Sequence, residues 1–238
     1  MAILKSNPTV SRGIKSHSGP ALFLLAAILL VLPSRTGADT LDQIHRQGEI
    51  VWGADAEGGA PYIFPDPQEP SRLIGFEVDL MELIAGQLGV KSRHFQNAWD
   101  NLVPALERGD IEVAVNGLEI TPDRLARVRF TRPYYIYTEQ LVVRAEENGI
   151  AGLADLKKKR VGTLSGTAAQ DILEGLGGVD LKIYAGQVEP YEDLALGRLD
   201  AVLLDLPIAA YYARPNPRLK FVGPPEGEGY YGIAARRE

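Results

Sequence analysis

The chain has 238 residues, with 25 lysines and arginines against 31 aspartates and glutamates, and a formal charge of −6 at pH 7. This acidic balance opposes binding to nucleic acids and to anionic membranes, which require basic surface, so we expect no nucleic-acid partner. The chain has no cysteine, which excludes disulfides and cysteine-linked lipids. The histidines His17, His45 and His94 are scattered, so the sequence indicates no metal site, and no motif calls for a cofactor.

Residues 1–38 have the layout of a secretory signal peptide. They contain four basic residues and no acid, and the apolar block 21–32 is short against the roughly 20 residues needed to cross a bilayer. A small-x-small site follows and ends at Ala38. A retained membrane anchor is the alternative, but we predict cleavage after Ala38. The remainder has 21 basic and 31 acidic residues, so its formal charge is 21 minus 31, or −10.

Strand and helix patterns alternate along the rest of the chain. The expected strands are 49–53, 91–95, 112–115, 140–144, 160–164, 181–184, 200–204, 221–222 and 231–235. The expected helices and helical turns are 75–88, 100–108, one beginning at 121, 153–156, one beginning at 167, 188–197 and 205–213. This alternation predicts an α/β fold with parallel sheets covered by helices. In such sheets, ligands bind at the carboxyl ends of the strands.

The segment from Asn116 to Arg124 is the most informative of these strand ends. Thr121 and Pro122 are suited to be the N-cap and first residue of a helix. Arg124 then falls in the first turn, beside unpaired backbone N–H groups and the positive end of the helix dipole. A guanidinium in that place is suited to planar, bidentate capture of a carboxylate. The alternative is a surface arginine beside an ordinary cap.

Polar and aromatic residues gather at the other strand ends as well. Together they predict a site for a small zwitterion, formed by Asp55, Glu57, Tyr62, Trp99, Asn116, Gly117, Glu119, Arg124, Ser165, Thr167, Ala168 and Asp205. A carboxylate would meet Arg124 and the amides near Thr167 and Ala168. An ammonium would meet Asp205 and Glu119, and an apolar stem would pack on the indole of Trp99.

Each member of this set also has a purely structural interpretation. Thr167 and Asp205 could simply cap helices, Trp99 could belong to the core, and the acids after the first strand could be solvated. Glu119 precedes the expected helix and could pair with Arg124, five residues further along.

The chain from residue 53 to residue 238 resembles the family 3 extracellular solute-binding proteins of amino-acid ABC transporters. The matching stretches are 75–80 (GFEVDL), 99–106 (WDNLVPAL), 121–124 (TPDR), 130–135 (FTRPYY), 165–167 (SGT) and 197–205 (GRLDAVLLD). The stretches 58–62, 186–191 and 227–231 resemble in particular the branch in which the binding domain is fused to its permease. Relatives continue with further helices, so by this resemblance the chain is C-terminally short.

The resemblance implies a two-lobed periplasmic-binding-protein clamshell of type II, each lobe a mostly parallel sheet flanked by helices. Lobe 1 would comprise 39–142 and 230–238, and lobe 2 would comprise 143–229. An amino acid would bind between them, its α-carboxylate on Arg124 and its α-ammonium on Asp205. Many relatives have serine or threonine at the position of Glu119, which here adds a negative charge to the pocket.

The implied function is that of a periplasmic substrate-binding component, a monomer and not an enzyme. It would deliver a polar or cationic L-amino acid to an ABC permease in the membrane, driven by a cytoplasmic ATPase. The preference for such a ligand follows from the acids Asp55, Glu57 and Glu119 near the pocket. A periplasmic cyclohexadienyl or arogenate dehydratase on the same scaffold is the alternative, with Glu119 as general acid. A sensory module that binds an amino acid ranks after both.

Overall fold

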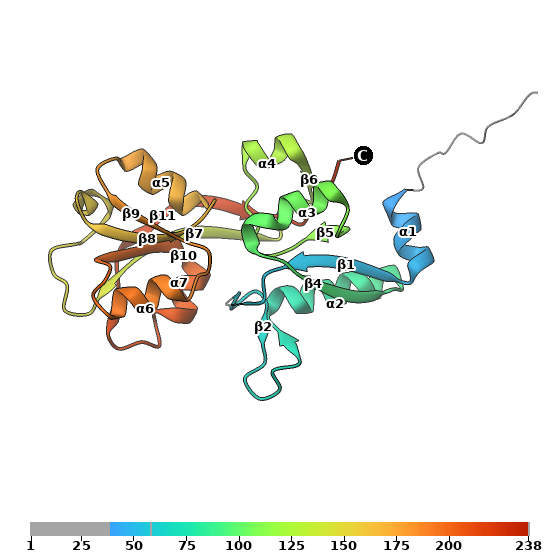
Figure 1. Cartoon of the computed structure of the whole chain (residues 1–238), viewed down its shortest axis with the longest axis horizontal. Helices are drawn as coiled ribbons and strands as arrows, with labels where there is room; N and C mark the ends of the chain where they lie inside the picture. Colours follow the sequence, from blue (N-terminus) through green and yellow to red (C-terminus); the bar gives the residue numbers. More distant parts are fainter. Residues whose placement is uncertain (1–38, 58, 238) are drawn as a thin grey trace, which may run out of the picture. The chain divides into compact units, whose positions relative to one another are not determined.

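The computed structural model describes residues 39–57 and 59–237, and the expected signal peptide, 1–38, lies outside them. Within those described ranges, no helix combines the length and the apolar character that a membrane crossing requires. The described chain forms two five-stranded sheets and a small two-stranded one (Figure 1).

The first sheet has the strand order β4-β1-β5-β12-β6. Its strands are β1 (Glu49–Ala54), β4 (Lys91–Gln96), β5 (Val113–Ala114), β6 (Val128–Phe130) and β12 (Ala234–Arg236). The helices around it are α1 (Thr40–Gln47), α2 (Phe76–Leu88), η1 (Trp99–Asn101), α3 (Leu102–Arg108) and α4 (Pro122–Arg127). The two-stranded sheet pairs β2 (Phe64–Pro65) with β3 (Leu73–Ile74).

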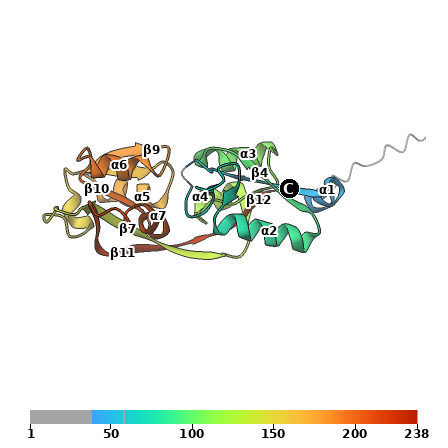
Figure 2. The same ribbon diagram turned by 90° about the horizontal axis from the view of Figure 1, so that it is seen from below.

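Alternation along β1 explains why helices cover both faces of the first sheet. Successive side chains of a strand point to opposite faces. Ile50 and Trp52 belong to the same apolar cluster as Met81 of α2, whereas Val51 belongs to the cluster of Leu106 in α3. Figure 2 accordingly shows α2 and α3 on opposite faces of these strands.

The second sheet has the strand order β11-β7-β10-β8-β9. Its strands are β7 (Tyr135–Arg144), β8 (Arg160–Leu164), β9 (Asp180–Tyr184), β10 (Ala201–Asp205) and β11 (Leu219–Tyr231). Its helices are η2 (Leu153–Leu156), α5 (Ala168–Leu176), α6 (Glu189–Ala195) and α7 (Leu206–Tyr212). The central strand β10 is buried along its whole length, as expected for a strand with helices on both faces.

The chain passes between the two sheets twice, from β6 into β7 and from β11 into β12. The end of β11 is tied back to the first sheet, because Gly232 donates its N–H to the carbonyl of Leu118 and Tyr231 forms a bridge with Glu119. Each sheet therefore contains antiparallel neighbours next to parallel ones.

The predicted α/β class is confirmed, but the sheets are mixed instead of mostly parallel. In each sheet two neighbouring pairs are parallel and two are antiparallel. The antiparallel pairs all involve β7, β11 or β12, the strands on either side of the two crossings. Expected strands at 140–144 and 221–222 extend to 135–144 and 219–231, and the helix expected at 100–108 begins with a 3-10 turn.

Candidate functional site

Nine of the twelve predicted site residues line one cavity, to which both sheets contribute. They are Asp55, Glu57, Tyr62, Trp99, Asn116, Gly117, Glu119, Thr167 and Asp205, and the lining is completed by Gly59, Leu164, Ala185, Gly186, Gln187 and Ile208. The free volume is about 30 Å³, which is room for one or two water molecules. An amino acid would therefore require the two sides to move apart.

The other three predicted residues lie outside this lining. Arg124 and Ala168 line a neighbouring groove, which shares Trp99 with the cavity. Ser165 lines neither, and its N–H donates to the carbonyl of Tyr184 at 2.9 Å, as part of the second sheet. Glu119, which lines the cavity, connects it to Arg124.

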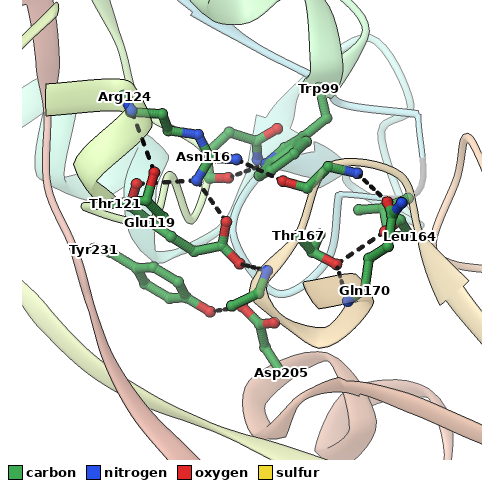
Figure 3. A network of polar contacts seen from close by, with 12 residues as sticks. Trp99, Asn116, Glu119, Thr121, Arg124, Leu164, Thr167, Gln170, Asp205 and Tyr231 are labelled. Atoms are coloured by element: carbon green, nitrogen blue, oxygen red, sulfur yellow. Dashed lines mark hydrogen bonds and ion pairs between the residues drawn. The ribbon is translucent and has the colours of Figure 1, made fainter. Parts of the chain in front are cut away.

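Arg124 forms an ion pair with Glu119 (Figure 3). Thr121 caps α4 and Pro122 is its first residue, as expected, and this places Arg124 in the first turn. Its Nη1 donates to Oε2 of Glu119 at 2.6 Å and to that residue's carbonyl at 3.0 Å. Its Nη2 donates to the carbonyl of Gly166 at 2.8 Å, and the guanidinium lies 4.8 Å from the ring centre of Trp99. The pairing left open by the sequence is therefore present.

The carboxylate of Glu119 also joins the two sheets. Its Oε1 accepts the N–H of Ala168, the first residue of α5, at 2.9 Å. Only 1% of the Glu119 side chain is exposed. Thr167 has the structural role considered above, since its hydroxyl caps α5 by accepting the N–H of Gln170 and donates to the carbonyl of Leu164. Both helix starts thus fix groups around a single buried carboxylate.

Asp205 occupies the N-cap position of α7, but its side chain accepts no capping hydrogen bond. It accepts the hydroxyl of Tyr231 instead, and that hydroxyl also meets the hydroxyl of Tyr62 at 2.9 Å. The ring of Tyr231 stacks between Tyr137 and Tyr135. The carboxylate of Asp205 is therefore held at the cavity by the hydroxyl of Tyr231, whose ring is packed against other tyrosines, and it does not cap α7.

Glu139 is a buried acid that the sequence analysis did not include. It lies on β7 directly opposite Asp205, with 1% of the residue exposed, and no donor among the described residues reaches either carboxyl oxygen. One oxygen each of Glu119, Glu139 and Asp205 lies within 4.8 Å of the others. An acid directly before the expected strand 140–144 was a signal that could have been noticed, but its partner depends on strand register.

Burial governs the protonation of this acidic cluster. Removal from water raises the pKa of Asp205 to about 7, and the negative charge of Glu119 adds to the effect. Burial and Asp205 raise the pKa of Glu139 well above its usual range. Burial also raises the pKa of Glu119, although Arg124 and the N–H of Ala168 oppose it. Such a cluster can hold protons, an ammonium group or a divalent cation.

A fourth buried acid, Glu77, supports the loop that follows β5. Glu77 accepts the N–H of Gly117 at 2.7 Å and the hydroxyl of Tyr134, and burial raises its pKa to about 7. The N–H of Gly117, one of the predicted site residues, is therefore already engaged by Glu77. Asn116 accepts the N–H of Asp55 at 2.9 Å and so connects the ends of β1 and β5.

The acids of the first loop lie at the outer part of the cavity. Asp55 accepts a hydrogen bond from the side chain of Gln96 and one from the N–H of Glu57, each at 2.9 Å. Glu57 is exposed and Asp55 is half-buried. They have room to meet a polar or cationic group without being confined by packing.

Residues 50–220 match the model of the bacterial extracellular solute-binding proteins, family 3. The L-cystine-binding protein TcyJ of Escherichia coli K12 is 31% identical over 230 residues, which cover 93% of this chain and 85% of that protein. A probable histidine-binding protein of Neisseria gonorrhoeae is 30% identical over 224 residues, covering 91% and 82%.

Solved structures give the same answer for the fold. The holo form of ArgBP from T. maritima matches with a TM-score of 0.77 at 30% identity, over 82% of this chain and 86% of that one. The ancestral amino acid-binding protein AncCDT-1, described as a precursor of cyclohexadienyl dehydratase, matches with a TM-score of 0.78 at 30% identity, over 84% and 86%.

Proposed function

The chain belongs to the bacterial extracellular solute-binding proteins of family 3, and from this premise we propose that it is the periplasmic substrate-binding component of an amino-acid ABC transporter. It is exported by a cleaved signal peptide, binds a polar or cationic L-amino acid, and acts as a monomer. It delivers that ligand to a membrane permease driven by a cytoplasmic ATPase.

One observation carries this proposal. The cavity between the two sheets is lined by two buried acids, Asp205 from the second sheet and Glu119, and Glu119 pairs with the largely buried Arg124 of the neighbouring groove. An α-amino acid has the complementary pair of charges at its α-carbon. Relatives named for cystine, arginine and histidine support a ligand of this class.

Binding by this proposal works through closure of two lobes, comprising 39–142 with 230–238 and 143–229. The crossings between the sheets act as the hinge, and a ligand that contacts both lobes favours the closed form by its differential affinity. The α-carboxylate approaches Arg124, the α-ammonium approaches Asp205, and the side chain extends toward Asp55 and Glu57.

A ligand panel tests the proposal directly. The mature chain, from residue 39, is titrated calorimetrically with arginine, lysine, histidine, glutamine, cystine and leucine. We expect saturable binding of at least one polar or cationic amino acid, and weaker binding of leucine. The acids of the cavity and its rim interact favourably with positive charge, which leucine's side chain lacks. Tighter binding of leucine than of arginine or glutamine would contradict the ligand class, and absence of binding by all six would contradict the function.

A dehydratase is the second candidate, favoured by the likeness to a dehydratase precursor and by a buried carboxyl at the cavity, Glu119, whose pKa is raised. Such a group could act as a general acid. Its ion pair with Arg124 weighs against this, since the pair favours the charged form. Incubation with prephenate or arogenate, followed by detection of the aromatic product, separates the two candidates.

A further inference from the structure

The carboxylate of Glu119 already occupies the donors that the proposed function assigns to the ligand, and the role inferred for Glu119 rests on that function. Arg124 gives Nη1 to one oxygen at 2.6 Å, and the first N–H of α5 gives a second hydrogen bond to the other oxygen at 2.9 Å. An arginine and a backbone N–H at a helix start are the two donors expected for a carboxylate. Glu119 reproduces the contacts of a ligand's carboxylate from within the chain (Figure 3).

The rest of the cavity lining favours a positively charged group over a carboxylate. None of the described residues that line it is cationic, whereas Asp205 and Glu119 lie in the lining and Glu139 lies directly behind Asp205. The other terminal nitrogen of Arg124, Nη2, donates a hydrogen bond to the carbonyl of Gly166. A carboxylate that enters the cavity meets negative charge, while an ammonium meets the buried acid Asp205, behind which a second buried acid, Glu139, lies.

We propose that Glu119 supplies in the chain itself the carboxylate that Arg124 and the start of α5 would otherwise take from the ligand. The ligand's own carboxylate is then dispensable. The site accepts amines that are the decarboxylated counterparts of amino acids, such as agmatine, histamine and cystamine, about as readily as the amino acids themselves. Glu119 is the residue that sets this specificity.

The experiment compares each amine with its parent amino acid on several forms of the mature protein. The pairs are agmatine and L-arginine, histamine and L-histidine, and cystamine and L-cystine, titrated calorimetrically at pH 7. The measured quantity is the ratio of Kd for the amine to Kd for the parent. In the wild-type protein we expect this ratio to be about 3 or lower for the pair that binds best.

Two variants at the same position test the assignment to Glu119. Glu119→Ser is too short to reach both donors, so the parent's carboxylate becomes the group that neutralises a largely buried Arg124, and the ratio should rise at least about 30-fold. Glu119→Gln keeps the length but leaves the arginine's charge unpaired, so the ratio should rise at least about 10-fold. Asp171→Asn is the matched control, because Asp171 is an exposed acid whose charge acts on Glu119 without touching these donors. Its ratio should stay within about threefold of the wild-type value.

The outcomes separate this inference from the function on which it rests. A wild-type ratio above about 30 overturns it without any variant, and so does a ratio that Glu119→Ser and Glu119→Gln leave unchanged, while amino-acid binding itself stands. If circular dichroism shows that Glu119→Ser is not folded, the Kd ratios of the wild-type protein and of Glu119→Gln test the inference. If folded wild-type protein binds neither amines nor amino acids, the proposed function and this inference both fail.

Discussion

Asp205 and Glu139 are cross-strand partners on β10 and β7, and both carboxyl groups are buried. Like charges directly opposite each other on a sheet are destabilising, and burial increases the cost. The chain keeps this pair although Arg124, the cation beside the third acid of the cluster, is engaged by that acid, Glu119. The arrangement is consistent with a cationic group arriving from outside, and it has consequences that can be measured before any ligand is known.

Replacement of Glu139 by Gln should stabilise the unliganded protein at pH 8. The buried acid has no donor partner, whereas an amide brings two N–H groups next to Asp205. We expect the free energy of unfolding to rise by about 1–3 kcal/mol at pH 8 and to change little at pH 5. Urea denaturation of the mature chain measures it.

Glu228→Gln provides the control, since Glu228 is an exposed acid of β11 that does not lie opposite Glu139. A surface change of this kind should stay within about 0.5 kcal/mol. A loss of stability at pH 8 in Glu139→Gln would contradict the prediction.

The unliganded protein should lose stability as the pH rises from 6 to 8. Burial raises the pKa of Asp205 and of Glu77 to about 7, so the folded state keeps protons that the unfolded state has released above pH 5. As the pH rises, stability therefore falls over the range in which the folded state binds more protons than the unfolded state. This change is complete once the pH exceeds the pKa values of the two carboxyl groups in the folded state. We expect a decrease on the order of 1–3 kcal/mol by urea denaturation.

His94 acts in the opposite direction at lower pH. Burial lowers its pKa, so its contribution is lost as the pH falls through the range below 6.5. Equal or greater stability at pH 8 than at pH 6 would show that the two carboxyl groups are not protonated as described.

Arg124→Ala should weaken amino-acid binding by about 2–5 kcal/mol, because it leaves Glu119 buried without its cation and removes the contact with Gly166. Calorimetry with the best ligand of the panel measures this. Arg127→Ala is the matched control on the same helix, since Arg127 pairs with Glu107 on the surface and such pairs contribute little. Unchanged affinity in Arg124→Ala would refute the assigned role.

Tyr231→Phe should destabilise the protein by about 1–3 kcal/mol at pH 8, because the ionised Asp205 loses its hydroxyl donor. The loss should be smaller at pH 5, where that carboxyl is protonated. Tyr230→Phe is the control, since this neighbouring tyrosine is exposed and its hydroxyl bonds only to Glu228 among the described residues. The idea fails if the two substitutions have the same effect in thermal or urea unfolding at pH 8.

Local signals in the sequence predicted most elements of the fold and much of the cavity lining. Thr121 with Pro122, and Thr167 on its own, mark helix starts that the structure confirms. The α/β class and membership in a family of two-lobed binding proteins are confirmed as well. Placement in the branch fused to a permease, the lobe boundaries and the assignment of these residues to a ligand stay predictions.

The features that the sequence could not supply depend on contacts between distant segments. The importance of Glu139 follows from the register of β7 against β10, and the contact of Glu119 with Ala168 joins residues of different sheets. The length of β11 was missed because its middle, 223–229, is rich in glycine and proline, yet it stays paired with β7 across two register shifts. Composition predicts a turn there, and long-range pairing overrides it.

The intrinsic fluorescence of Trp99 reports on the surroundings of the cavity. The chain has two tryptophans, and the other, Trp52, is packed under α2 with its Nε1 bonded to Ser92, away from the cavity. Trp99 lies against the guanidinium of Arg124 and donates its own N–H to the carbonyl of Asn116. Trp99 also lies next to Gly166, which follows β8 of the second sheet. Separation of the two halves changes the surroundings of this one chromophore, so emission from the unlabelled protein can follow that separation in real time.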